Sequence, residues 1–166
     1  MVGQIINGEL VVTPRPAPRH ILVSSMLGTK LGGPFGLGEG GGPGGWWILD
    51  EPELHLREDV LVPDLAGWRR ENMPVLPEES WFSTPPDWVC EVLSPGTAAT
   101  DRVLKMPIYA AQGVRHLWVI DPAARLLEVY RLEDGRWLVL GAHGGADRVR
   151  AEPFHEVELD LAPLWA

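Results

Sequence analysis

The sequence has a single cysteine, no long hydrophobic run and no excess of positive charge, and each absence excludes a class of protein. Cys90 alone cannot form an internal disulfide or a multi-cysteine zinc site, which fits a reducing compartment. No apolar run approaches the roughly 18 residues of a membrane span, and the N-terminus lacks a basic-then-apolar signal pattern. Asp and Glu outnumber Lys and Arg by 23 to 14, and this net charge of −9 argues against a basic, nonspecific nucleic-acid coat. We therefore expect a cytoplasmic protein without a membrane segment.

What remains is an ordinary globular composition. The 166 residues are 45% hydrophobic and 22% charged, which is far from the composition of a disordered chain. A chain of this length buries enough surface to fold as one domain, and we assign residues 1–166 to it.

The apolar pattern predicts many strands and two helices. The turn pair Asn7-Gly8 predicts a β-hairpin over residues 4–12, and nine glycines between 32 and 45 predict a mobile loop. Pro63 interrupts the strand-like residues 60–68, which favours an edge strand or a bulge. Helical periodicity predicts helices over 19–31 and 100–112. The second helix is expected to be capped by Thr100 or Asp101, and it is either kinked at Pro107 or restarts there. Apolar runs bounded by turn signals predict strands over 88–93, 116–121, 126–132 and 136–143. The fold class is α+β or mixed α/β.

Glu91 is the most informative position because its carboxylate is embedded in the apolar strand WVCEVL. Burying such a group costs several kcal/mol unless a partner compensates it. Asp64 occupies a similar place after Pro63 in a second strand-like segment. If the two strands are neighbours, both carboxylates can converge on a hard divalent cation, and the backbone carbonyl of Val92 can supply a third oxygen. Each residue alone also fits a simpler interpretation, a turn aspartate for Asp64 and a structural salt bridge for Glu91.

The helix that follows carries a polar face. Asp101, Lys105 and Tyr109 are spaced four apart and end at Gly113. The face could simply be solvated. Since strand, Ser-Pro turn and helix are consecutive, Lys105 can also fold back beside the carboxylate pair.

These strings resemble a known family. INGELVV with PRPAPRH, then VPDLAGW, PPDWVCEVLSP, the Asp101 to Gly113 series and GVRHLWVIDP are similar to the Uma-two family of restriction endonucleases in the PD-(D/E)XK nuclease superfamily. The likeness covers about residues 4–163. It implies a restriction-endonuclease-like central mixed β-sheet flanked by helices, with an N-terminal β-hairpin. Members often carry a helical segment before that hairpin, so a chain starting here is expected to fold more loosely at its N-terminus.

The resemblance also assigns roles. Asp64 would be the first metal-binding aspartate and Glu91 the second acidic ligand. Leu93 stands where the superfamily usually has its lysine, so Lys105 is the candidate, held in place by Tyr109. Glu9 and His20 match the family's N-terminal Gly-Glu and His positions and are expected to line the same pocket.

The expected function is Mg²⁺- or Mn²⁺-dependent hydrolysis of DNA phosphodiester bonds by a homodimer. The alternative is a catalytically silent module on the same fold that acts in oligomerisation or regulation, with the carboxylates kept as an ion-pair network around Lys105. A thiol enzyme using Cys90 is a distant third, because that thiol lies in an apolar strand and faces away from Glu91. Glu53 and His55 are expected on the wet face of a strand.

Overall fold

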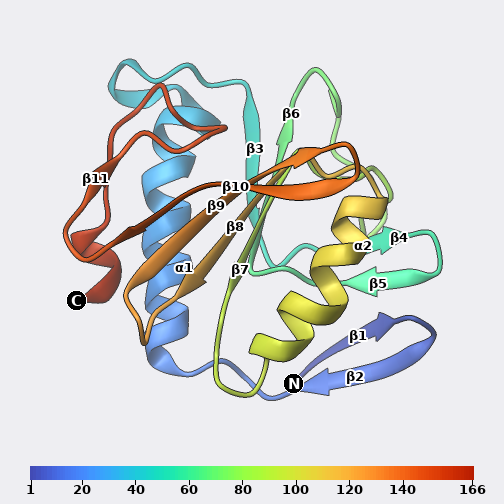
Figure 1. Ribbon diagram of the computed structural model, residues 1–166. Coiled ribbons are helices and arrows are strands. Elements are labelled where there is room, and N and C mark those ends of the chain that lie inside the picture. The colour runs from blue at the N-terminus through green and yellow to red at the C-terminus, as the bar shows by residue number, and fades with distance from the viewer.

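The protein, described over all 166 residues in a computed structural model, is built on a six-stranded mixed sheet with helices on both faces (Figure 1). The strand order is β10-β9-β8-β7-β6-β3, and only β7 and β8 are parallel. A second, four-stranded sheet has the order β2-β1-β5-β4. The strands are β1 (Val2–Ile6), β2 (Glu9–Thr13), β3 (Trp46–Asp50), β4 (Leu54–Leu56), β5 (Asp59–Leu61), β6 (Leu65–Arg69), β7 (Trp88–Val92), β8 (His116–Asp121), β9 (Leu126–Glu133), β10 (Arg136–Gly144), β11 (Arg148–Val149) and β12 (Leu159–Asp160).

The helical elements lie between these strands. They are α1 (Pro18–Leu31), the π-helical turn η1 (Gly32–Leu37), the 3-10 turn η2 (Glu39–Gly41), the π-helical η3 (Thr100–Lys105), α2 (Met106–Ala111) and the 3-10 turn η4 (Ala162–Trp165). No helix is both long and apolar enough to cross a membrane. The predicted fold class and N-terminal hairpin are confirmed, with Asn7 and Gly8 at φ 52° and 82° in the hairpin turn.

Two hydrophobic cores occupy opposite faces of the large sheet. Trp88, Cys90 and Val92 of β7 face the core under α1, whereas Val89 faces the core under α2. This alternation follows from the two-residue period of a strand. Glu91 therefore points toward the α2 side, and Cys90 points away from it as predicted.

Pro63 separates two strands rather than distorting one. β5 ends at Leu61 in the small sheet, and β6 begins at Leu65 in the interior of the large sheet, so the expectation of an edge strand or bulge is wrong. A proline cannot donate to a ladder, and here it lies in the link where the chain changes sheets. That link delivers Asp64 to the start of β6.

The glycine-rich segment is ordered, which corrects the expectation of a mobile loop. It forms η1 and η2, and Phe35 within it is 1% exposed. Phe35 packs on Phe154 at a ring separation of 4.8 Å, so this one aromatic anchors the segment to the core.

The second helix starts earlier than the capping signals predicted. Helical conformation begins at Ala98, and neither Thr100 nor Asp101 caps it with its side chain. Pro107 lies in the first turn of α2, directly after η3, which is the predicted restart. Because Asp101 is inside the helix, its carboxylate turns toward Lys105 instead.

Candidate active site

The two predicted carboxylates lie opposite each other on neighbouring strands. β6 and β7 are antiparallel with Leu65 paired to Cys90, so continuing the register by one residue sets Asp64 against Glu91. Both residues, with Val92, line a cavity of about 270 Å³. The juxtaposition on which the sequence analysis depended is therefore present.

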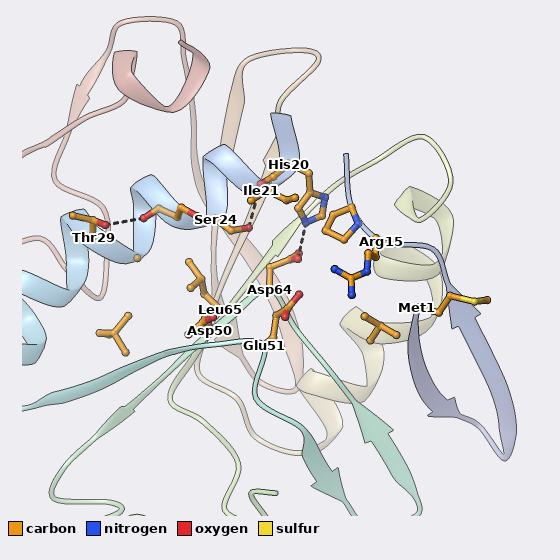
Figure 2. A pocket seen from close by; sticks show the side chains of 15 residues that line it. Met1, Arg15, His20, Ile21, Ser24, Thr29, Asp50, Glu51, Asp64 and Leu65 are labelled. Atoms are coloured by element: carbon orange, nitrogen blue, oxygen red, sulfur yellow. Dashed lines mark hydrogen bonds and ion pairs between the residues drawn. The ribbon is translucent and has the colours of Figure 1, made fainter. Parts of the chain in front are cut away.

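Asp64 is held at both carboxylate oxygens. Oδ1 lies 2.6 Å from Nε2 of His20, which comes from the first turn of α1 (Figure 2). Oδ2 accepts the backbone N–H of Val92 at 2.7 Å. His20 and Asp64 also line a larger cavity of about 830 Å³ that runs beside α1. Asp64 thus stands where the two cavities meet.

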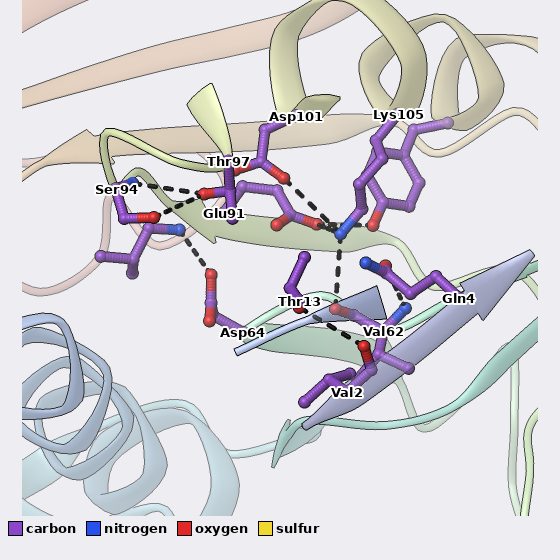
Figure 3. A network of polar contacts seen from close by, with 12 residues as sticks. Val2, Gln4, Thr13, Val62, Asp64, Glu91, Ser94, Thr97, Asp101 and Lys105 are labelled. Atoms are coloured by element: carbon purple, nitrogen blue, oxygen red, sulfur yellow. Dashed lines mark hydrogen bonds and ion pairs between the residues drawn. The ribbon is translucent and has the colours of Figure 1, made fainter. Parts of the chain in front are cut away.

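Lys105 reaches Glu91 from the helix, as predicted, but its second carboxylate partner is Asp101 and not Asp64. Its Nζ lies 2.8 Å from Oε1 of Glu91 and 3.7 Å from Oδ1 of Asp101, and it donates to the Val62 carbonyl at 3.4 Å (Figure 3). Lys105 is only 1% exposed and Glu91 only 2%. A buried ammonium is stable only with such partners, so three elements, β7, η3 and the β5–β6 link, are fixed to one another here.

Burial and the opposing charges shift the ionisation of this cluster. Burial raises the pKa of Glu91 well above its usual range, and the ammonium of Lys105 offsets part of that increase. The pKa of Asp101 is raised for the same reason. Burial by itself would lower the pKa of Lys105, but the carboxylates of Glu91 and Asp101 outweigh it, so the pKa is raised and the side chain stays an ammonium.

Tyr109 contacts a different partner from the one expected. Its hydroxyl donates to Oε1 of Glu91 at 2.7 Å, whereas the side chain that holds Lys105 from within the helix is Asp101. The reason is reach: Tyr109 lies one turn beyond Lys105, and its ring carries the hydroxyl back to the strand. Asp101 had been noted only as part of the polar face.

The hairpin contributes Gln4 rather than Glu9. Gln4 is 5% exposed, lines the smaller cavity and accepts the N–H of Val62 through Oε1 at 2.9 Å. Glu9 starts β2 on the exposed side of the hairpin and lines neither cavity, so the expectation that it shares a pocket with His20 is not met. The hairpin pattern of residues 4–12 does not indicate that Gln4 is buried, because its burial depends on how the small sheet meets the large one.

The donor set fits a hard divalent cation. Asp64, Glu91 and the Val92 carbonyl are oxygen donors on adjacent strands that line one cavity, which is the chemistry Mg²⁺ and Mn²⁺ prefer. No three His, Cys, Asp or Glu side chains are grouped as a ready-made metal cage. The candidate metal ligands are thus limited to two side-chain carboxylates and one backbone carbonyl.

Two other candidates lie away from this site. Cys90 is fully buried on the opposite face, and burial raises the pKa of its thiol well above the ordinary value, which leaves it without nucleophilic character. Glu53 and His55 pair with each other at 2.7 Å on the exposed side of β4, as the wet-face interpretation predicted.

Comparison with known proteins places the chain among restriction-endonuclease-like proteins. The family model "Uma2: Putative restriction endonuclease" matches residues 4–162. A crystal structure from Anabaena variabilis ATCC 29413, titled as a putative nuclease belonging to DUF820, superposes with a TM-score of 0.78 at 21% identity, covering 98% of this chain and 89% of that one. No curated protein matches the sequence.

Proposed function

Because the chain belongs to the Uma2 family of restriction-endonuclease-like proteins, we propose that it is a metal-dependent nuclease that hydrolyses phosphodiester bonds in DNA. One observation carries the proposal: Asp64 and Glu91 face each other across β6 and β7 with the ammonium of Lys105 at 2.8 Å from Glu91. Two carboxylates can hold a divalent ion that activates water and polarises a phosphate, and a nearby ammonium can stabilise the charge that develops on the phosphate.

Each side chain has a role in this chemistry. Asp64, Glu91 and the Val92 carbonyl would hold Mg²⁺ or Mn²⁺, which when bound polarises the phosphate and acidifies a water. Lys105 orients the attacking water or stabilises the charge that develops on the phosphoryl oxygens. Because its pKa is raised, Lys105 acts as a cation and not as the proton acceptor. His20 fixes one oxygen of Asp64, and Tyr109 fixes one oxygen of Glu91.

The acidic surface restricts where DNA can approach. At a net charge of −9, phosphates are attracted only where cations are concentrated. The smaller cavity is lined by two full cations, Arg15 and Lys105, and by four acids: Glu51, Asp64, Glu91 and Asp101. A bound divalent ion would add the remaining attraction.

Plasmid nicking tests the proposal. Purified protein with Mg²⁺ or Mn²⁺ should relax supercoiled plasmid, and Asp64→Ala or Glu91→Ala should lower the rate by at least about 100-fold. Glu53→Ala, on the exposed side of β4, is the matched control and should cleave like the wild type. Equal cleavage by both site variants would show that the activity belongs to a contaminant or to another site.

A catalytically silent module is the second candidate, and the closed contact network favours it. Both oxygens of Asp64 and Oε1 of Glu91 already have protein partners. On this account the cluster is a structural ion-pair network and binds no metal through Asp64 or Glu91.

The cytoplasmic location and the homodimer stay predictions, and sedimentation velocity tests the homodimer.

A further inference from the structure

The larger cavity continues directly from the proposed catalytic cluster. Its volume is about 830 Å³, against about 270 Å³ for the cavity that holds Glu91 and Lys105. The two share six lining residues: Val2, Arg15, Pro16, His20, Glu51 and Asp64. A substrate whose reacting phosphate lies at Asp64 can therefore extend directly from the smaller cavity into the larger one.

Arg15 is the arginine that lines both cavities. It lies between β2 and α1, and Figure 2 shows its guanidinium directed toward Asp64 and Glu51. Lys105, the other full cation of the cluster, is neutralised by Glu91 and Asp101. None of the ion pairs of the structure involves Arg15, so its guanidinium keeps its donors free for a phosphate.

The wall along α1 leaves room for an uncharged group. Gly28 lies in the helix interior, where glycine is less stable than alanine. A Cβ there would meet only Leu65 Cδ2 at 3.6 Å, so packing does not demand the glycine. The missing side chain instead widens the cavity between α1 and β3.

The charges of the cavity separate its two ends. Arg15 lies at the shared end together with Glu51 and Asp64, so a phosphate there needs Arg15 to offset their repulsion, whereas the lining along α1 is uncharged: Ser24, Ser25, Gly28 and Thr29. Carboxylates do accept hydrogen bonds from the amino groups of nucleobases. The end near Arg15 therefore suits a phosphate, and the remainder suits a sugar and base.

We propose that this cavity is a substrate subsite: Arg15 binds a phosphate of the DNA strand, and the nucleoside next to the scissile bond lies against Gly28 of α1. The subsite rests on the proposed nuclease function and extends it by naming what holds the substrate beside the reacting phosphate.

Two readouts test the subsite separately from catalysis. The first is the Kd of a fluorescent DNA oligonucleotide, measured by anisotropy with Ca²⁺ present. The second is hydrolysis of bis(p-nitrophenyl) phosphate with Mn²⁺, a diester that has no nucleoside. The variants are Arg15→Ala and Gly28→Leu, with Arg19→Ala as the matched control because Arg19 is exposed near the same helix end and lines neither cavity.

The subsite predicts that Arg15→Ala and Gly28→Leu raise the Kd for DNA about tenfold. Both should lower hydrolysis of the small diester less than they weaken DNA binding, because that diester has no nucleoside to fill the cavity, and Arg19→Ala should change neither readout. Equal Kd values for Arg15→Ala and Arg19→Ala, or loss of small-diester hydrolysis together with DNA binding, would overturn it. If the wild type hydrolyses neither plasmid DNA nor bis(p-nitrophenyl) phosphate while the Kd pattern holds, the nuclease proposal fails and the subsite stands.

Discussion

Lys105 illustrates how a single buried cation joins the site to the fold. It is 1% exposed and lies between two carboxylates that are themselves buried. The smaller cavity reaches this cluster, but each of the three side chains is at most 5% exposed, so bulk water cannot take over these contacts. The side chain that we propose for catalysis is therefore also needed for stability.

Replacing that cation should cost much of the stability. Lys105→Met leaves Glu91 and Asp101 buried without a cation, although Tyr109 still donates to Glu91, and breaking a buried ion pair in this way costs about 3–5 kcal/mol. Urea unfolding followed by tryptophan fluorescence measures the loss. Arg148→Met, which breaks a largely exposed pair with Glu158 at 3.5 Å, should cost at most about 1 kcal/mol. Similar losses for both variants would contradict the buried-network account.

His116 gives the protein a defined sensitivity to acid. Burial lowers its pKa to about 4, the nearby Glu152 opposes this, and Arg69 and Arg131 add to it. The folded state thus prefers the neutral ring, and the unfolded pKa is about 6.5. The neutral ring has no effect on stability above pH 6.5, where it is neutral in both states. The free energy of unfolding then falls as the pH drops from 6.5 toward 4, because only the unfolded state takes up the proton.

His116→Gln should therefore flatten the acid limb of the stability curve. Free energies of unfolding at pH 7.5, 6 and 5 should fall less steeply in this variant than in the wild type. His155→Gln, at an exposed position, serves as the control and should follow the wild type. A wild-type slope in His116→Gln would show that the imidazole is not the titrating group.

Local sequence signals predicted the elements well where the pattern was self-contained. The order of β7, Ser-Pro turn and helix was predicted correctly, although not the start of the helix at Ala98, because apolar strand, turn residues and helical spacing follow one another without interruption. The same local order made the approach of Lys105 to Glu91 predictable. Elements that depend on distant contacts were not predictable, and the glycine-rich segment is the clearest case.

The packing of that segment is itself testable. A Cβ on Gly42 would lie 2.4 Å from the Pro34 carbonyl oxygen and 2.5 Å from Pro34 Cα, which are backbone atoms that cannot move aside easily. Gly42→Ala should destabilise the protein by about 1–3 kcal/mol. Gly36→Ala, where no atom lies within 4 Å of the added Cβ, should have almost no effect. Thermal unfolding compares the two, and equal Tm values would indicate a mobile loop after all.

The whole molecule shows why the site could be predicted only in part. Asp64, Glu91 and Lys105 were identifiable because two carboxylates in apolar strands require compensation wherever the strands lie. Gln4, Arg15 and the α1 cavity depend on how the small sheet meets the large one, and that arrangement is set by Pro63 and the chain's change of sheet. A strand pattern does not record which sheet a strand will join.

The same arrangement is compatible with the proposed nuclease being an acidic protein. The chain has a net charge of −9, and the proposed catalytic cluster lies in a cavity lined by residues of the hairpin, β7 and η3. On the nuclease proposal, DNA binds where the free guanidinium of Arg15 and a bound divalent cation attract its phosphates. The central claim is that Asp64 and Glu91 hold that cation together.

Calorimetric titration with Mn²⁺ tests this claim most directly. The wild type should bind Mn²⁺ with a resolved stoichiometry, and Asp64→Asn and Glu91→Gln, which keep the shape of each side chain, should each weaken binding by at least about tenfold. Glu53→Gln should bind like the wild type. Absence of binding, or binding that both site variants retain, would contradict the account and leave the carboxylates as a structural network.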